Sequence, residues 1–296
     1  MEYVERLKQL DLFQLVFYKG TLVSTPLLRW KIAIMRIELI LENPQPTWIP
    51  FDYNHPLASC IYQSLGASSG EYADDLHDHG VAFQGKHFKL FTFSQLLADG
   101  RPEIDRRRGG LIFRSPTIRW QISSPVDEFV THFANGILSR GVVSVRDATF
   151  PVREVRTLAP PQFTSTMRFK CLSAITVSTH IDTAGLNPLQ YCRIENGFYE
   201  KVAENLRRKH ELLALGESEP NSSLITGHSS LTMTFDPDYV ARHRIDKLID
   251  YKGTKIFAYL CPFTVTGDPG LIRIGYECGF GDGNSKGFGM VEVDHH

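Results

Sequence analysis

Six glycines fall within the fifteen residues from Gly275 to Gly289, close to the C-terminal end of the chain. Glycine lets the backbone approach a ligand closely and adopt positive φ angles, so the N–H groups of such a segment can converge on an anion. Lys286 lies inside the segment and adds a positive charge. These residue types at this spacing could therefore bind a phosphate group.

Several patterns compete for this glycine-rich segment. A Walker loop needs Gly-Lys followed by Ser or Thr and then a helix, whereas Lys286 is followed by Gly287 and Phe288. A Rossmann turn needs a βαβ unit behind it, and only seven residues follow Gly289. The stretch KGFGMVEV is close to the RNA-binding RNP1 pattern but lacks its second and third aromatics. A tight loop that tucks the last strand into its sheet is equally compatible, so the segment alone leaves RNA contact and a structural loop open.

The cysteines and histidines do not predict a metal site. The number of cysteines is odd and none forms a CxxC motif, which excludes a disulfide framework and a thiolate zinc site. They are Cys60, Cys171, Cys192, Cys261 and Cys278. The histidine spacings include no HExxH motif. We expect reduced thiols in a cytoplasmic protein, with no metal and no other cofactor.

A basic cluster lies inside a nearly neutral chain. Its 296 residues carry 32 Lys and Arg against 33 Asp and Glu, a net charge of -1, which excludes a protein that is basic throughout. A local basic face is still compatible with that total. From Arg101 to Arg119 six arginines stand against two acids, and Arg106–Arg108 precede two glycines, so this run predicts phosphate contacts.

A second basic cluster contains Lys201, Arg207, Arg208 and Lys209. Three glutamates within the same predicted helix offset it. Balanced charges of this kind are typical of a solvated helix face, so we expect these side chains to be exposed.

The elements that must position these residues follow the order strand, helix, strand, strand, helix, strand, twice. In the first half the predicted segments are a strand at 35–44, helices at 54–66 and 71–80, a strand at 87–94, a bent or paired strand segment at 109–124 that breaks at Ser115–Pro116, a helix at 125–140 and a strand at 142–158. In the second half they are a strand at 167–179, a helix at 196–215, strands at 229–235 and 255–267, an ambiguous segment at 271–279 and a strand at 287–293. Asn54 or His55 is the expected cap of the first helix.

This order predicts an α+β protein made of two tandem ferredoxin-like (RRM/RAMP-like) βαββαβ domains. Ala159–Gln162 is the expected linker, so the domains would be 35–158 and 163–296. Residues 1–34 fit neither unit, and we expect an appendage whose deletion leaves a soluble, active protein. No apolar run approaches the ~20 residues of a membrane span, and the start has no secretory signal, so we expect no membrane contact.

The segment GYECGFGDGNSKGFGMVEV resembles the signature of the CRISPR-associated endoribonucleases that process repeat RNA, in the RAMP superfamily. IPFDYNHPLASCIYQSLG, YADDLHDHG and KLFTFS are similar to the N-terminal region of that family in order and spacing, and FKCLSAITVST resembles the strand that opens its second domain. The resemblance covers residues 35–296. It implies a metal-independent endoribonuclease that cleaves CRISPR repeat RNA in precursor transcripts to give guide RNAs.

The resemblance also implies the chemistry. The 2′-OH beside the scissile phosphate attacks phosphorus, leaving a 2′,3′-cyclic phosphate and a 5′-OH, which calls for acid/base groups and a fixed cation. The tyrosine, histidine and lysine of the family correspond to Tyr62, His77 and Lys89. We assign proton transfer to His77, because histidine ordinarily titrates near neutrality, 2′-OH positioning to Tyr62, and charge neutralisation to Lys89. The rivals at neighbouring positions are His79, Lys86 and His87.

The expected RNA contacts combine the basic run with the glycine-rich segment. They are Arg106, Arg107, Arg108, Gly279, Gly281, Gly283, Lys286, Gly287, Phe288 and Gly289. The expected partner is CRISPR repeat RNA, and other effector-complex subunits and a second copy in a homodimer are left open. The alternative function is a non-catalytic RNA-binding RAMP subunit of an effector complex, which would lack the acid/base residues; His77 in register favours the enzyme.

Overall fold

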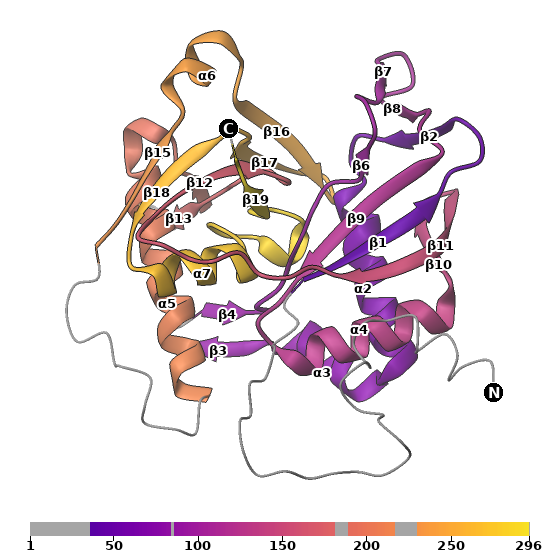
Figure 1. Cartoon of the computed structure of the whole chain (residues 1–296), viewed down its shortest axis with the longest axis horizontal. Helices are drawn as coiled ribbons and strands as arrows, with labels where there is room; N and C mark the ends of the chain where they lie inside the picture. Colours follow the sequence, from indigo (N-terminus) through magenta and orange to yellow (C-terminus); the bar gives the residue numbers. More distant parts are fainter. Residues whose placement is uncertain (1–35, 84–85, 181–188, 217–229, 296) are drawn as a thin grey trace.

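The computed structural model describes residues 36–83, 86–180, 189–216 and 230–295. The predicted appendage, residues 1–34, lies outside the described residues. In Figure 1 the chain forms two lobes side by side, the first coloured indigo to magenta and the second orange to yellow. None of the helices in the described part combines the length and the apolar character that a membrane crossing needs.

The first half is an antiparallel sheet with helices against it. Its elements are β1 (Arg36–Glu42), β2 (Thr47–Pro50), α2 (Asn54–Ser68), α3 (Gly70–Asp78), β3 (Val81–Phe83), β4 (Lys86–Phe88), β5 (Thr92–Phe93), β6 (Leu97–Ala98), β7 (Glu103–Asp105), β8 (Gly110–Phe113), β9 (Thr117–Ser123), α4 (Asp127–Arg140), β10 (Val142–Val145) and β11 (Ala148–Thr157). The main sheet has the order β10–β11–β1–β9–β5, with β6 also paired to β9. The last segment thus lies beside the first, which is the ferredoxin-like order.

Hydrophobic periodicity accounts for the helices of this half. Leu57, Ile61 and Leu65 lie on one face of α2 and are fully buried, as their spacing predicts. They join Phe133 of α4 and Trp120 of β9 in one core. This core holds α2 rigidly against the sheet.

The second half repeats the arrangement. Its elements are β12 (Thr166–Cys171), β13 (Ser178–His180), β14 (Leu189–Tyr191), η2 (Ile194–Asn196), α5 (Phe198–Gly216), β15 (Leu231–Phe235), α6 (Pro237–Arg242), β16 (Asp246–Tyr251), β17 (Thr254–Tyr259), β18 (Phe263–Gly267), α7 (Pro269–Cys278), η3 (Asn284–Lys286) and β19 (Val291–Val293). The sheet order is β15–β18–β12–β19, and β16 and β17 form a separate hairpin inserted between β15 and β18. Two tandem ferredoxin-like units are therefore confirmed.

Several local predictions need correction or completion. The strands predicted at 142–158 and 167–179 are each two strands, β10 with β11 and β12 with β13. The single strand predicted at 87–94 is two strands, β4 and β5, separated by a loop in which Leu90 has a φ of 46°. The single strand predicted at 255–267 is β17 and β18, because Pro262 lies between them and has no N–H to donate to a ladder. The ambiguous segment 271–279 lies almost wholly in α7, where Asp268 caps the helix by accepting hydrogen bonds from the N–H groups of Gly270 and Leu271.

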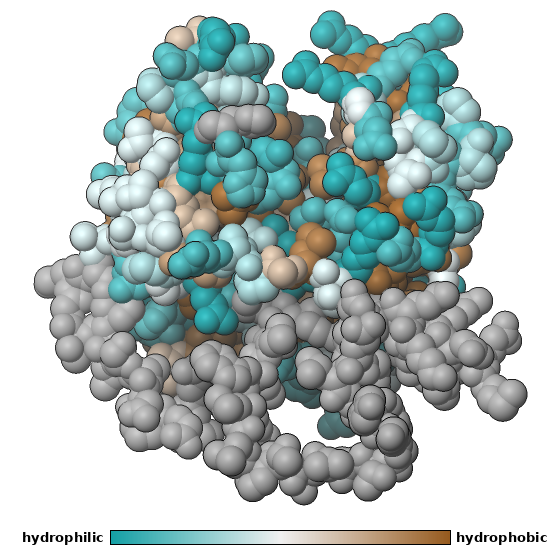
Figure 2. Space-filling model, viewed as in Figure 1, coloured by the Kyte–Doolittle hydropathy of each residue, from teal (hydrophilic) through white to brown (hydrophobic). Residues whose placement is uncertain are grey.

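A buried arginine of the first half ties it to the second. Arg36, at the start of β1, donates hydrogen bonds of 2.7 Å to the carbonyl oxygens of Val291 and Tyr276. Its guanidinium lies 3.7 Å from the ring centroid of Tyr276. Burial lowers the pKa of Arg36 to about 10, so the side chain stays charged at neutral pH. Figure 2 shows apolar residues in the seam between the lobes, on a face that is otherwise mostly hydrophilic.

Two further side chains of the first half hold the glycine-rich segment. Asn54 was a candidate helix cap, but Tyr53 occupies the cap position and makes no side-chain cap bond. Asn54 instead donates to the carbonyl oxygens of Lys286 and Gly287, at 3.2 and 3.1 Å. The Thr92 hydroxyl donates to the carbonyl oxygen of Phe288 at 3.0 Å. The first half therefore fixes where this segment lies.

Candidate active site

The structure brings Tyr62, His77 and Lys89 together from three elements: α2, the last turn of α3, and the loop between β4 and β5. The ring centroids of Tyr62 and His77 are 5.1 Å apart, with the rings nearly perpendicular. The Lys89 ammonium lies 5.2 Å from the ring centroid of Tyr62 and donates a 2.5 Å hydrogen bond to the backbone oxygen of His77. These three residues form one cluster, although the sequence separates them.

The His77 imidazole is oriented by its neighbour. Its side chain is 64% exposed, and Nδ1 lies 2.8 Å from Oδ1 of Asp78. A carboxylate only accepts hydrogen bonds, so this contact keeps a proton on Nδ1 and leaves Nε2 for a substrate. The same hydrogen bond lowers the pKa of Asp78 below its usual value. His79 instead contacts Asp75 at 3.2 Å, so the ring packed against Tyr62 belongs to His77 rather than to its rival.

Burial shifts the pKa of each of the other two residues. It raises the pKa of Tyr62 above the ordinary value, with a further contribution from Tyr251, so Tyr62 is a neutral hydroxyl. Burial also lowers the pKa of Lys89; Asp78 opposes this shift and the nearby Lys286 ammonium adds to it. Two ammonium groups that repel one another favour an anion between them. The side chain of Lys86, a rival of Lys89, lies outside the described part of the structure.

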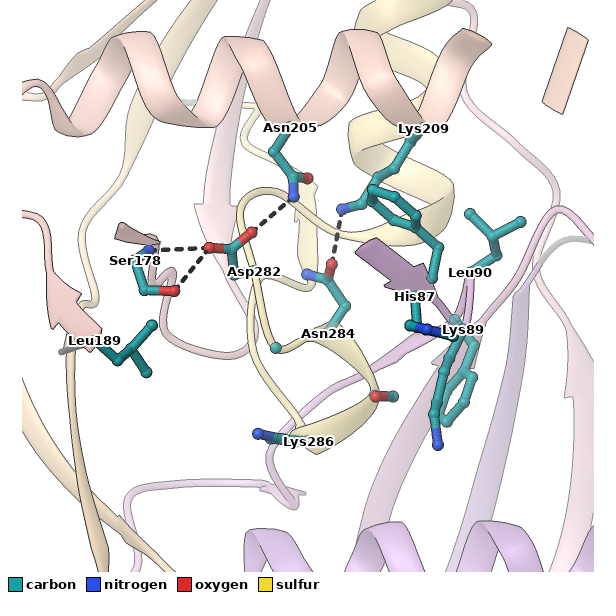
Figure 3. A pocket seen from close by; sticks show the side chains of 14 residues that line it. His87, Lys89, Leu90, Ser178, Leu189, Asn205, Lys209, Asp282, Asn284 and Lys286 are labelled. Atoms are coloured by element: carbon teal, nitrogen blue, oxygen red, sulfur yellow. Dashed lines mark hydrogen bonds between the residues drawn. The ribbon is translucent and has the colours of Figure 1, made fainter. Parts of the chain in front are cut away.

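A cavity of about 390 Å³ lies between the two halves beside this cluster. Both halves contribute to its lining, which consists of His87, Phe88, Lys89, Leu90, Phe91, Ser178, Leu189, Asn205, Lys209, Asp282, Gly283, Asn284, Ser285 and Lys286. In Figure 3 the ammonium groups of Lys89 and Lys286 both lie along the lower side of the glycine-rich loop. Because lysine is the predominant charged residue of this lining, the cavity suits an anionic ligand.

The glycines of the segment allow tight backbone packing. Five of them have positive φ angles: Gly279, Gly281, Gly283, Gly287 and Gly289. A Cβ on Gly289 would lie 2.1 Å from the carbonyl oxygen of Phe280, and one on Gly287 would lie 2.6 Å from the ring of Phe93. Neither position has room for a side chain, which accounts for part of the glycine pattern without any ligand.

Burial revises the expected RNA contacts of this segment. Phe288 is 0% exposed and belongs to a buried cluster, so its ring has no face open to a base. Gly287 and Gly289 are also buried. The expected contact through Phe288 does not fit the structure, and the part of the segment that lines the cavity is residues 282–286.

Lys209 has a role that the sequence analysis missed. We predicted a solvated side chain, but Lys209 is 3% exposed. Its ammonium donates to the carbonyl oxygens of Gly279 and Gly281, at 2.7 and 3.0 Å, and to Oδ1 of Asn284 at 2.7 Å (Figure 3). The prediction was wrong because the acceptors lie about 70 positions later in the chain. Helix periodicity could have indicated this burial, because Lys209 lies three positions after the apolar, buried Leu206 and therefore on the same helix face.

A second network anchors the loop at Asp282. Its Oδ2 accepts hydrogen bonds from the N–H and hydroxyl groups of Ser178, at 2.9 and 3.1 Å. Its Oδ1 accepts a 2.8 Å hydrogen bond from Nδ2 of Asn205 (Figure 3). Neither partner was singled out from the sequence, because hydroxyls and amides carry no charge pattern.

The structure does not bring the arginine run to this cluster. Arg106–Arg108 are exposed in the turn between β7 and β8, at the end of the first lobe opposite to α3 (Figure 1). Arg114 pairs with Glu103 at 2.7 Å, and Arg119 lies 3.7 Å from Glu38. The positive surplus of the run is therefore smaller than its composition suggests. Direct phosphate contact by the three arginines stays a prediction.

The described residues contain no group of three or more His, Cys, Asp or Glu side chains placed as metal ligands would be. The five cysteines are unpaired.

Comparison with known proteins places these features in a family. Residues 48–156 match the family model described as CRISPR-associated protein Cas6, N-terminal, and residues 158–293 match the one described as CRISPR associated protein Cas6, C-terminal. A CRISPR-associated endoribonuclease Cas6 of Methanocaldococcus jannaschii is 33% identical over 258 residues, which cover 87% of this chain and 92% of the relative. A CRISPR-associated endoribonuclease Cas6 of Pyrococcus furiosus is 27% identical over 268 residues, 87% of this chain and 89% of that protein.

A solved structure agrees with the sequence matches. A CRISPR associated protein Cas6 superposes with a TM-score of 0.67 at 30% identity, over 88% of this chain and 99% of the other. Sequence and structure thus match along both halves. The chain belongs to the Cas6 family of CRISPR-associated endoribonucleases.

Proposed function

We propose that the protein cleaves CRISPR repeat RNA in precursor transcripts without a metal ion and so releases guide RNAs. The observation that carries the proposal is the cluster of Tyr62, His77 and Lys89 beside a lysine-rich cavity. A non-catalytic RNA-binding subunit would have no need for a histidine whose Nδ1 is hydrogen-bonded to a carboxylate, so that Nε2 is left to exchange protons with a substrate.

The proposed reaction forms a bond from the 2′-oxygen to phosphorus and breaks the bond from phosphorus to the 5′-oxygen. The 2′-OH loses a proton and the 5′-oxygen gains one, giving a 2′,3′-cyclic phosphate and a 5′-OH. His77 transfers protons through Nε2, because Asp78 occupies Nδ1. Tyr62, kept neutral by burial, positions the 2′-OH by hydrogen bonding. Lys89 turns from the backbone of His77 to the phosphorane oxygens, whose extra charge it offsets.

The same proposal includes a division into domains at 35–158 and 163–296. A separate antiparallel sheet in each half supports this division. The interface between the halves then carries the cavity, and a transcript held there would lie against residues of both. Because the substrate is transcript RNA, we place the protein in the cytoplasm.

A matched pair of histidine variants tests the proposal. His77→Ala should lower the single-turnover cleavage rate by about 10²- to 10⁴-fold, the usual contribution of a proton-transfer group. His79→Ala removes another exposed imidazole two positions away and should cleave like the parent. Binding of an uncleavable repeat RNA should be unchanged in both variants. A His77→Ala variant that cuts as fast as the parent would reject the assignment.

A further inference from the structure

Tyr251 lies at the border of the catalytic cluster, although it comes from the other half of the molecule. It ends strand β16, at the tip of the hairpin inserted into the second half. Its ring meets the ring of His55, on α2, edge to face at a centroid distance of 5.5 Å. It also contributes to the raised pKa of Tyr62, which lies two turns further along the same helix face. The ring is only partly buried.

Lys286 connects Tyr251 to the cavity. Its ammonium lies 5.6 Å from the ring centroid of Tyr251, and the same side chain lines the cavity together with Lys89. The backbone of Lys286 is held in place, because its carbonyl accepts a hydrogen bond from Asn54 and its N–H donates to the carbonyl of Gly283. A fixed backbone with an exposed, flexible side chain lets the ammonium exchange the aromatic ring for a nearby anion.

The local charge favours a phosphate at this place. Lys89 and Lys286 come from different halves, and each would be stabilised by an anion between them. The neighbouring Asp250 is already neutralised by Lys255, at 2.8 Å. Asp78 also attracts Lys89, but its carboxylate is hydrogen-bonded to His77.

We propose that Tyr251, Lys286 and Lys89 form a subsite for one unpaired nucleotide of the RNA, with its phosphate at the scissile position. Lys286 leaves the Tyr251 ring to join Lys89 at the phosphate, and the uncovered ring stacks on the base. Unpaired RNA bases are commonly bound by stacking on aromatic side chains, which supply binding energy with little demand on base identity. This inference rests on the proposed function, since it takes the scissile phosphate to lie at Lys89.

The base contact is tested by combining protein and RNA changes. The RNA is a repeat with a 2′-deoxy scissile nucleotide, made abasic at each flanking position in turn, and Kd is measured for each. For the parent, one abasic position should weaken binding about 5- to 150-fold, the range for one stacked base. Tyr251→Ala should weaken binding of the intact RNA to the same extent and lose nothing further at that position. Tyr251→Phe should bind like the parent.

The stacking assignment would be overturned if the loss of affinity from Tyr251→Ala adds to the loss from the abasic site at every position. It would also be overturned if Tyr251→Phe binds as weakly as Tyr251→Ala. Tyr239→Ala is the matched control, because the Tyr239 ring also packs on a histidine ring, that of His243, at a centroid distance of 4.2 Å. Tyr239 belongs to α6, at the far end of the second lobe (Figure 1). It should leave Kd unchanged.

The phosphate contact is tested by rate. Lys286→Ala should lower single-turnover cleavage at saturating RNA by about 10²- to 10³-fold, as removal of a transition-state donor does, and Lys286→Arg should recover part of the loss. Lys170→Ala removes an exposed lysine paired with Glu292 and should cleave like the parent. An unchanged rate in Lys286→Ala would overturn the contact. If the parent does not cleave at all, the proposed function fails. If the parent cleaves but the effects of Tyr251→Ala and of the abasic positions on Kd are independent, only the subsite is rejected.

Discussion

Replacing Lys209 by methionine tests whether this buried lysine organises the glycine-rich loop. Methionine keeps the length and the apolar contacts of the stem but removes the ammonium. Three acceptors then lose their donor: the carbonyls of Gly279 and Gly281 and the side-chain oxygen of Asn284. A buried acceptor left unsatisfied costs about 1–3 kcal/mol. Because Asn284 is partly exposed and water can replace one bond, we expect a loss of about 3–5 kcal/mol in the free energy of unfolding.

The measurement is reversible urea unfolding, supported by thermal unfolding. The expected loss corresponds to a decrease in Tm of about 6–20 °C for a protein of this size. Lys201→Met is the matched control on the same helix, because the Lys201 side chain is 42% exposed and its ammonium forms an ion pair with Glu204. Exposed pairs contribute about 0–1 kcal/mol. If the two variants differ by less than about 1 kcal/mol, the loop does not depend on Lys209 and the reasoning fails.

Three other results are expected. Gly289→Ala should be far less stable than Gly253→Ala in thermal unfolding. Both glycines have φ near +80°, but only a Cβ at Gly289 would meet a nearby atom, the carbonyl oxygen of Phe280 at 2.1 Å. Equal losses of stability would contradict this account. Since burial raises the pKa of Tyr62, its hydroxyl stays protonated at neutral and mildly alkaline pH, so the pH–rate profile of Tyr62→Phe should keep the parental shape at a lower rate. Disappearance of an alkaline limb in that variant would show instead that Tyr62 titrates. Changing Arg106–Arg108 to alanine should reduce the salt dependence of log Kd by up to about 2 without changing the saturated cleavage rate, and an unchanged slope would show that these arginines bind no phosphate.

Local sequence patterns predicted most of the architecture. The spacing of Leu57, Ile61 and Leu65 predicted the buried face of α2 correctly, since helix periodicity depends only on neighbouring residues. The order of strands and helices predicted both ferredoxin-like units. The division of 87–94 into two strands was not predictable, because Leu90 must adopt a positive φ that only the surrounding packing makes favourable.

The candidate site was predictable only where a family pattern marked it. Tyr62, His77 and Lys89 were placed through the resemblance, and the structure brings them within contact of one another. Lys209 and Asn54 were misinterpreted, because their partners lie far along the chain and a single sequence contains no record of such pairs. A charge cluster that looks solvated can supply a buried cation when backbone carbonyls from another element surround it.

The central claim is cleavage by the RNA's own 2′-OH without a metal ion. The most direct measurement incubates the protein with repeat RNA in excess EDTA, with and without a 2′-deoxy nucleotide at the scissile position, and identifies the product ends. We predict cleavage in EDTA that yields a 2′,3′-cyclic phosphate and a 5′-OH, and complete loss of cleavage with the 2′-deoxy RNA. Cleavage of the 2′-deoxy RNA at the same site, or cleavage that requires a divalent metal, would contradict the account.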